Sequence, residues 1–299
     1  MNYLKSFLSL SSLLVVLTLF FASCSDDEEP TVEMPRAIFE FDVASDNSGT
    51  VNFTSLSLNA VTYAWDFGDG SGMSTEVNPS YTYASTGKYT VTLTVTNEGG
   101  TNTTTLDVSV VFNLVQGADM ANEAAWTFRN VWEDNVVNHG FVDGAFVWDN
   151  SEGFAFSQAY LWQEIALEAD KKYRFNADIK STSGTSDIWF EVYFGNADPA
   201  SEDDYGSNGL RLYVSSFDSP DSGCANDPFD GDILSLSQNC IPDPSNTKII
   251  SSDGSFTLTA DELTSNGTIY LVFKSGCWDN MDNYKDGISL DNIVLEEVL

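Results

Sequence analysis

Apolar and polar residues alternate along short stretches of the first third of the chain. In the stretch 88–96, every second residue is apolar, and threonine occupies most of the positions between them. Side chains of a strand point alternately to its two faces, so this pattern predicts a half-buried antiparallel strand. The stretch 37–41 behaves similarly, and turn signals at 69–72 and 98–100 separate such segments. Several short strands at this spacing predict a small β-sandwich over residues 36–111.

The following residues, 112–299, are also rich in strand patterns. Residues 173–179 alternate with their apolar side chains on one face, residues 268–273 are almost continuously apolar, and residues 288–295 close the chain with a further strand pattern. No helical periodicity persists along this part. We therefore expect an all-β chain in which a small sandwich is followed by a larger jelly-roll sandwich.

Three strands of the larger sandwich carry aromatic and charged residues opposite their apolar face. In 188–194 the apolar face is Phe190, Val192 and Phe194, and the stretches 160–165 and 210–214 have the same two-faced pattern. The opposite faces hold Trp189, Glu191 and Tyr193, then Tyr160, Trp162 and Glu164, then Arg211 and Tyr213. Aromatic rings stack on the C–H faces of sugars and planar polar side chains bind hydroxyl groups, so these faces predict a carbohydrate-binding groove. The alternative is that the rings pack beneath loops or against the small sandwich.

Other tryptophans are divided between binding and structural roles. Trp278 lies in a polar stretch, where it is either a sugar platform or a lid over the core, and Trp148 is a weaker candidate of the same kind. Trp126 and Trp132 are assigned to the core or to the contact between the sandwiches. The candidate carbohydrate-binding residues are thus Trp189, Glu191, Tyr193, Arg211, Tyr213, Trp162, Trp278 and Trp148.

The first 23 residues have the pattern of a secretory signal peptide. Lys5 supplies the positive start, and residues 7–21 form an apolar run that is short for a transmembrane helix. The sequence Phe-Ala-Ser-Cys ending at Cys24 resembles a bacterial lipobox, which implies cleavage before Cys24 and its acylation. The acidic run 25–29 resembles the export tag of surface-exposed lipoproteins in Bacteroidota. We therefore expect a lipid anchor at Cys24, an acidic tether over 24–35 and display on the outer membrane, with an ordinary signal peptide and a merely solvated tether as the alternatives.

Charge and cysteine content narrow the partners further. The 299 residues include 12 basic and 45 acidic ones, for a formal net charge of −33, and removal of the signal peptide with Lys5 makes it −34. Nucleic acid is disfavoured, because its phosphates need a basic surface. An exported chain permits disulfides. Cys224 and Cys240 close a short polar stretch and are the favoured pair, although Cys277 could replace either partner.

Part of the small sandwich resembles a known domain family. Residues 63–70 (Tyr-Ala-Trp-Asp-Phe-Gly-Asp-Gly), 79–83 and 87–93 resemble the polycystic-kidney-disease (PKD) domain, an Ig-like sandwich. The resemblance implies that Trp65 is a core residue and that the domain serves as a spacer. Asp66 and Asp69 are expected to stabilise turns, with cation binding as the alternative.

The larger sandwich resembles the jelly-roll carbohydrate-binding modules at residues 113–115, 163–180 and 287–293. This resemblance implies a structural calcium ion near Asp119 and Asp291. A PKD domain and such a module on a lipoprotein resemble the glycan-binding lipoproteins of Bacteroidota polysaccharide-utilisation loci. The resemblance implies an outer-membrane glycan transporter and surface hydrolases as partners, and a β-glucan such as laminarin as the ligand.

Two other functions compete with polysaccharide binding. A glycoside hydrolase or lyase is one, but the sequence has no Glu-x-Asp-x-x-Glu strand, no Gly-x-Ser-x-Gly elbow and only His139 as an imidazole base. An adhesin or structural lipoprotein is the other, and it predicts no ordered aromatic groove. We therefore expect a non-catalytic polysaccharide-binding protein.

Overall fold

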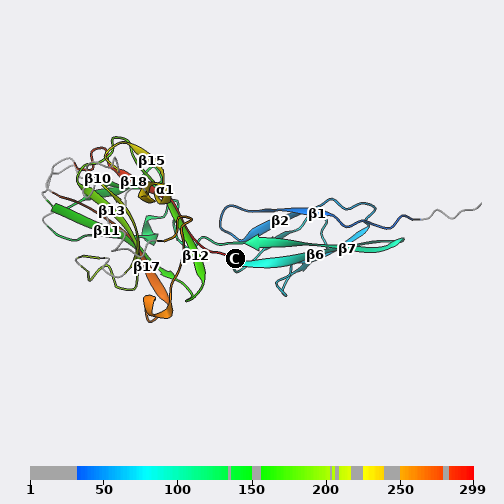
Figure 1. The fold of residues 1–299 in the computed structure, drawn as a ribbon. Helices are drawn as coiled ribbons and strands as arrows, with labels where there is room; N and C mark the ends of the chain where they lie inside the picture. Colours follow the sequence, from blue (N-terminus) through cyan, green and yellow to red (C-terminus); the bar gives the residue numbers. More distant parts are fainter. Residues whose placement is uncertain are drawn as a thin grey trace, which may run out of the picture.

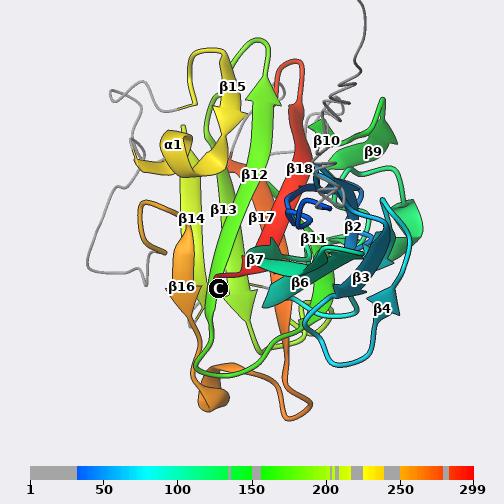
Figure 2. The same ribbon diagram turned by 90° about the vertical axis from the view of Figure 1, so that its right-hand side faces the viewer.

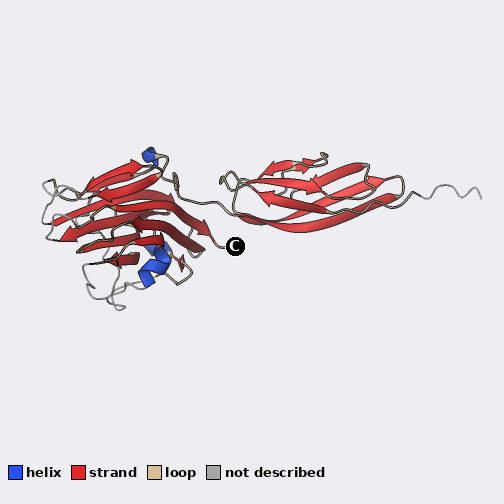
Figure 3. Ribbon diagram, turned by 90° about the horizontal axis from the view of Figure 1, so that it is seen from above, coloured by secondary structure: helices blue, strands red, loops and turns tan. Residues whose placement is uncertain are grey.

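The computed structural model describes most of the chain after residue 31. The described ranges are 32–133, 136–149, 156–202, 204–205, 209–216, 225–238, 250–278 and 283–299, and the side chains of residues 210, 211, 238 and 278 lie outside this description. Figures 1 and 3 show two strand-rich bodies joined end to end, which confirms the predicted all-β fold. Within the described ranges the one α-helix is α1 (Ile233–Gln238), a single short segment that the sequence did not predict.

The N-terminal sandwich packs a three-stranded sheet of order β1-β2-β5 against a four-stranded sheet of order β4-β3-β6-β7. Its strands are β1 (Phe39–Val43), β2 (Thr50–Ser55), β3 (Thr62–Asp66), β4 (Met73–Ser74), β5 (Ser80–Thr82), β6 (Gly87–Asn97) and β7 (Gly100–Val110). The long hairpin β6–β7 is antiparallel along its whole length, from Gly87 opposite Val110 to Asn97 opposite Gly100. The alternating stretch 88–96 is therefore a strand, as predicted.

Trp65 lies at the centre of the N-terminal core, as the resemblance to the PKD domain implies. Its side chain is 1% exposed, and its ring centroid lies 5.0 Å from that of Phe39 and 5.5 Å from that of Phe53. The indole N–H donates to the carbonyl oxygen of Glu76 at 2.9 Å, so burial leaves no polar atom of the ring without a partner.

The acidic residues after β3 stabilise a turn. Asp66 accepts from the Gly68 N–H at 2.9 Å, and Asp69 accepts from the Ser71 N–H at 3.0 Å. The Tyr81 hydroxyl donates to Asp69 at 2.6 Å, and this bond, aided by the bond from Ser71, lowers the pKa of Asp69 to about 2. These contacts confirm the turn-stabilising role expected for both carboxylates.

The C-terminal sandwich consists of two larger antiparallel sheets. One has the order β15-β12-β18-β10-β9, which runs across Figure 2, with β16 paired to β12; the other has the order β14-β13-β17-β11-β8. The strands are β8 (Thr127–Asn130), β9 (Asn138–Val142), β10 (Ala145–Asp149), β11 (Phe156–Ala166), β12 (Lys172–Ser181), β13 (Ile188–Gly195), β14 (Leu210–Ser215), β15 (Phe229–Asp232), β16 (Ser255–Thr257), β17 (Thr268–Trp278) and β18 (Ile288–Glu297). Two facing sheets of this size form the predicted jelly-roll sandwich.

The core of the C-terminal sandwich lies between these sheets. The side chains of Phe175 and Ile179 enter it from β12, and those of Phe190 and Phe194 enter it from β13, all at most 2% exposed. These residues are the ones that alternation assigned to the apolar faces. The other face of each sheet is therefore left for loops, solvent or ligands.

Asn113 lies where the two sandwiches meet. Its N–H donates to Asn47 Oδ1 at 2.7 Å, and its carbonyl accepts from Asn47 Nδ2 at 2.9 Å. Its side-chain Nδ2 donates to the Ile293 carbonyl at 2.7 Å, and its Oδ1 accepts from the Leu295 N–H at 3.0 Å. One residue thus hydrogen-bonds both to a turn of the N-terminal sandwich and to β18.

Candidate functional site

The five-stranded sheet β14-β13-β17-β11-β8 carries the predicted aromatic and charged residues on the face that points away from the core. Two neighbouring rows run across β11, β17, β13 and β14. The first row is Tyr160, Lys274, Glu191 and Tyr213, and the second is Trp162, Val272, Tyr193 and Arg211. The strand register therefore brings together residues that alternation had placed on separate, unpaired strands.

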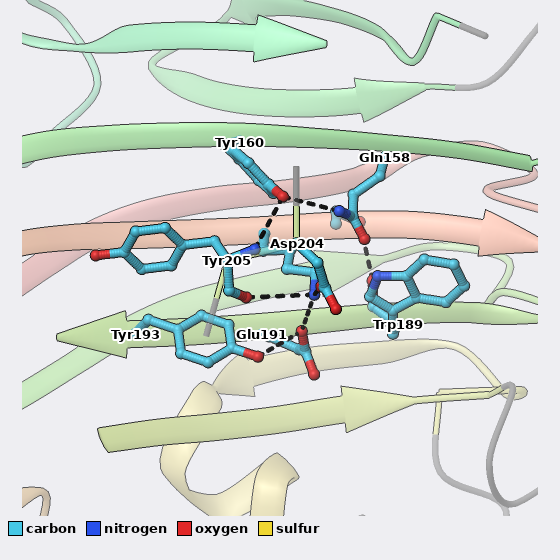
Figure 4. A network of polar contacts seen from close by, with 9 residues as sticks. Gln158, Tyr160, Trp189, Glu191, Tyr193, Asp204 and Tyr205 are labelled. Carbon is cyan, nitrogen blue, oxygen red and sulfur yellow. Dashed lines mark hydrogen bonds and ion pairs between the residues drawn. The ribbon is translucent and has the colours of Figure 1, made fainter. Parts of the chain in front are cut away.

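A segment between β13 and β14 covers one half of this face. Arg129 Nη1, on β8, donates to the carbonyl oxygens of Pro199 and Glu202 at 3.1 and 3.0 Å. The Tyr205 N–H donates to the Tyr160 hydroxyl at 3.1 Å, as Figure 4 shows. We call this region the covered half, and its buried residues are Val131, Tyr160, Trp162, Tyr193, Tyr205 and Val272.

The prediction that Trp162, Tyr193 and Tyr213 line an open groove is wrong. Trp162 is 8% exposed, Tyr193 is 2% exposed and Tyr213 is 6% exposed. For Trp162 and Tyr193 the alternative holds, because both side chains are buried in one cluster with Tyr205, which follows β13. Burial of a second aromatic cluster in this way stabilises the sandwich and leaves no room for a sugar ring on these two side chains.

An ion pair lies at the border of the covered half. Lys274 Nζ lies 3.1 Å from Glu191 Oε2 and 2.6 Å from Asp204 Oδ1, and Glu191 also accepts from the Tyr193 hydroxyl at 2.8 Å (Figure 4). The side chains of Lys274 and Glu191 are 8% and 7% exposed, so Glu191 is not the exposed sugar ligand that was predicted. Burial alone would lower the pKa of Lys274, but the two carboxylates outweigh burial and raise it. The ammonium group therefore stays charged and holds Asp204 over the face.

The other part of the face carries three partly exposed aromatic rings, of which Trp132 also packs against the buried cluster of the covered half. Trp189 on β13, Phe156 on β11 and Trp132 after β8 are each partly exposed. The ring centroids of Trp189 and Phe156 lie 5.8 Å apart with a 42° angle between the planes, and those of Phe156 and Trp132 lie 4.5 Å apart at 51°. We call these three residues the aromatic strip. Figure 4 shows Trp189 beside Gln158, so a buried amide adjoins the strip.

The aromatic strip was only partly foreseen from the sequence. Trp189 was predicted as a binding residue, whereas Trp132 was assigned to the core or to the contact between the sandwiches; it is partly exposed and packs against the buried cluster of the covered half. Phe156 was missed, although it lies two residues before Gln158 and four before Tyr160 on the same face of β11. Extension of the alternating pattern from Tyr160 by two periods would have found it.

Trp148 is a core residue rather than a sugar platform. It is fully buried on β10, where it lies opposite Ile288 of β18, and its ring meets that of Phe190 edge-on at 5.1 Å. The stretch Val-Trp-Asp-Asn suggested a loop, but its first three residues continue β10. The strand turns the ring inward, so the prediction for Trp148 is wrong.

Several predicted residues lie partly or wholly outside the described part of the chain. Arg211 and Trp278 belong to β14 and β17 by their backbones, so Trp278 ends a strand, but their side chains are not described. The proposed anchor Cys24 and the pair Cys224 and Cys240 also lie outside the described residues and stay predictions. Cys277 is buried, and its Sγ lies 3.0 Å from Ser157 Oγ. Among the residues described, no helix is long and apolar enough to cross a membrane.

The expected calcium ligands Asp119 and Asp291 interact electrostatically. Burial raises the pKa of Asp291, and the negative charges of Asp178 and Asp119 raise it further. Asp178 also accepts from Asn292 Nδ2 at 3.0 Å. In the described ranges no group of three or more His, Cys, Asp or Glu side chains is arranged to hold a metal ion. A calcium site here would therefore need backbone carbonyls or water beside these carboxylates.

Comparison with known proteins gives a family for the first sandwich. Residues 32–111 match the PKD domain. A stretch of 71 residues is 44% identical to the pre-pro-metalloprotease PrtV of Vibrio cholerae serotype O1 (strain M66-2), a match that covers 23% of this chain and only 8% of that protein. The crystal structure of the PKD1 domain of Vibrio anguillarum Epp is 42% identical in sequence. The match covers 26% of this chain and 94% of that domain, with a TM-score of 0.24.

Over most of the chain the similarity to a solved structure is more distant. A structure from a study of carbohydrate-binding modules of the β-sandwich superfamily is 18% identical; the match covers 89% of this chain and 99% of that one, with a TM-score of 0.38. At this level the likeness concerns the sandwich fold. The assignment of a site therefore rests on the side chains of this protein.

Proposed function

We propose that the protein is a non-catalytic polysaccharide-binding lipoprotein of the cell surface. The observation that carries this proposal is the aromatic strip, in which Trp132, Phe156 and Trp189 are partly exposed on the outer face of a sheet, with Trp132 packed against the covered half. Partly exposed aromatic rings beside polar side chains are typical of carbohydrate-binding sites.

The strip is suited to weak binding of a long polymer. Each aromatic contact contributes about 0.5–1.5 kcal/mol beyond burial. Three rings with a few hydrogen bonds then give dissociation constants of roughly micromolar to millimolar order. Many lipid-anchored copies on one surface would raise the apparent affinity for a polymer that several of them touch.

Anchoring and spacing follow from the proposed cell-surface role. Cys24 carries the lipid, residues 24–35 form the tether, and the N-terminal sandwich lies between the tether and the C-terminal sandwich along the chain. The captured glycan is passed to an outer-membrane transporter and to surface hydrolases, which supply the catalysis in this proposal.

A neutral glycan is the ligand that the local charges favour. The positive charge of Lys274 is already neutralised by Glu191 and Asp204, and the whole chain has a net charge of −33. A heavily charged anionic polymer would therefore be repelled. We propose a β-glucan, with laminarin as the first candidate.

Calcium is proposed as a structural ion near Asp119 and Asp291. A divalent cation would relieve the repulsion that raises the pKa of Asp291. The check is the thermal midpoint of the C-terminal sandwich with calcium and with a chelator. A midpoint that is the same under both conditions would exclude a structural ion.

The test of polysaccharide binding is affinity electrophoresis of residues 24–299 with Cys24→Ser. Gels contain laminarin, mixed-linkage glucan, xylan, mannan, pectin or alginate, and each polymer is also assayed for new reducing ends. Trp189→Ala is compared with Tyr63→Ala, which removes a partly exposed ring of the N-terminal sandwich. We expect retardation by a neutral polymer that is lost in Trp189→Ala and kept in Tyr63→Ala, without cleavage. New reducing ends would indicate an enzyme, and no retardation in any gel would indicate an adhesin or structural lipoprotein.

A further inference from the structure

Tyr160 joins the covered half of the face to the surroundings of Trp189. Its hydroxyl oxygen accepts two hydrogen bonds, from Gln158 Nε2 at 2.8 Å and from the Tyr205 N–H at 3.1 Å (Figure 4). Gln158 and Tyr160 lie two residues apart on the same face of β11, and both are buried. One hydroxyl group thus contacts the segment that covers the face on one side and the amide that lies beside Trp189 on the other.

The segment that supplies the Tyr205 N–H is fixed to the sheet. We call the described part of this segment, from the end of β13 to Tyr205, the strap. Lys274 Nζ lies 2.6 Å from Asp204 Oδ1, and Arg129 Nη1 donates to two carbonyl oxygens of the strap. The Tyr205 side chain is 3% exposed, and its ring centroid lies 6.2 Å from that of Tyr160. Because the strap cannot shift without loss of these contacts, it holds the Tyr160 hydroxyl in one place.

The contact with Tyr160 decides which end of the Gln158 amide faces Trp189. A side-chain amide carries its donor NH₂ group and its acceptor oxygen on opposite sides. Because Gln158 Nε2 donates to Tyr160, the amide oxygen lies on the other side. Figure 4 shows the indole nitrogen of Trp189 turned toward Gln158. An indole N–H can only donate, so an amide oxygen is the atom that suits it.

Gly276 allows Gln158 and Trp189 to meet. The three residues form one row across β11, β17 and β13, with Gly276 in the middle. A Cβ atom at Gly276 would lie 2.4 Å from Trp189 Cζ2, so any other residue there would displace the indole and separate it from the amide. With no side chain between them, Gln158 is in place to hold the ring.

We propose that Gln158 and Tyr160 are positioning residues for Trp189, and that the strap supports glycan binding although it contacts no sugar itself. The strap fixes the Tyr160 hydroxyl, the hydroxyl fixes the Gln158 amide, and the amide fixes the plane of the indole. A ring that is held in one orientation before it meets a sugar loses less conformational entropy on binding. This inference rests on the proposed polysaccharide-binding function.

The experiment removes one link of this chain of contacts at a time. Tyr160→Phe removes the hydroxyl group and keeps the aromatic ring, and Gln158→Met removes the amide at similar length. Tyr193→Phe is the matched control, because it removes a similarly buried hydroxyl group on the same sheet face that donates to Glu191 instead. Unfolding midpoints are measured for all three variants, so that a loss of folding is recognised.

The readout is the indole N–H of Trp189, observed by proton–nitrogen correlation NMR in the protein used for electrophoresis and assigned with Trp189→Phe. We expect its signal to shift and its hydrogen exchange to become faster in Tyr160→Phe and in Gln158→Met, and to stay unchanged in Tyr193→Phe. The affinity for laminarin should fall about 2- to 10-fold in the first two variants, which is the factor that one hydrogen bond contributes.

Each outcome bears on the inference separately from the proposed function. An unchanged Trp189 signal in both variants would overturn the inference, whatever the affinities are. A signal that moves without any loss of affinity, or that moves equally in Tyr193→Phe, would overturn it as well. If the protein binds neither laminarin nor any of the other polymers, the proposed function fails, whereas the NMR signal still decides whether Gln158 and Tyr160 hold the ring.

Discussion

The two sandwiches differ in where they place their aromatic residues. In the N-terminal sandwich every aromatic side chain from Phe39 to Phe112 is either in the core or packed against it. In the C-terminal sandwich one set fills the core, and a second set lies on the outer face of a sheet, where the covered half buries some rings and the aromatic strip leaves others partly exposed. The two domains have the same fold class but place their aromatic residues differently. The first packs all of its rings into or against one core, whereas the second also packs rings on the outer face of a sheet.

The largest effect should come from the N-terminal core. Trp65→Ala removes a fully buried indole and is expected to lower the free energy of unfolding of that sandwich by about 3–5 kcal/mol. Urea unfolding followed by circular dichroism measures this. Glycan affinity of the protein that remains folded should be unchanged, since no ring of the strip is touched. A loss of affinity at full folding would break the division of roles between the two sandwiches.

Removal of the buried cation in the C-terminal sandwich should have the next largest effect. Lys274→Met leaves the Glu191 carboxylate buried without its closest counter-charge, which is expected to cost about 3 kcal/mol. The double variant Lys274→Met with Glu191→Leu removes both charges and should recover most of that stability. A double variant as unstable as the single one would show that the ion pair is not what holds this part of the face.

The junction between the sandwiches should be more tolerant. Asn113→Ala removes two side-chain hydrogen bonds to β18 and is expected to cost about 1–3 kcal/mol. Asn113→Asp keeps the acceptor for the Leu295 N–H and loses the donor to Ile293, so its effect should be smaller. Small-angle X-ray scattering should show a wider range of inter-domain arrangements for Asn113→Ala. An unchanged scattering profile would mean that other contacts define the junction.

The smallest effect should be a pH dependence in the C-terminal sandwich. His139 stacks on Phe128, and the resulting desolvation lowers the pKa of the imidazole below its ordinary value of 6.5. The unfolded chain therefore binds the proton more readily, so stability is fully present above about pH 6.5 and declines as the pH falls below it. The decline is small because the imidazole is largely exposed. Thermal midpoints between pH 5.5 and 7.5 measure it, and a slope equally steep in His139→Gln would assign it to other groups.

Alternation along the strands predicted which residues share a face, because backbone geometry alone sets that pattern. It placed Phe175 and Phe190 in a core, and it placed Trp189 and Tyr193 on one outer face. These are local properties of single strands, and a sequence carries them directly.

Exposure was not predictable in the same way. Trp162 and Tyr193 are covered because Arg129 holds a segment 70 and more residues away, through Pro199 and Glu202. Such long-range contacts leave no periodic signal. The prediction for Trp148 was wrong for a different reason, because the polar residues that follow it resembled a turn, whereas β10 continues to Asp149.

The central claim is that the aromatic strip, and not the covered half of the outer face, binds glycan. Hydroxyl-radical footprinting with mass spectrometry, with and without saturating laminarin, measures the solvent accessibility of individual aromatic side chains on the intact protein. The account predicts that Trp132, Phe156 and Trp189 become protected when laminarin is added, whereas Trp162 stays unreactive and Tyr63 is unchanged. Protection confined to the N-terminal sandwich, or an unchanged aromatic strip in a protein that demonstrably binds laminarin, would contradict it.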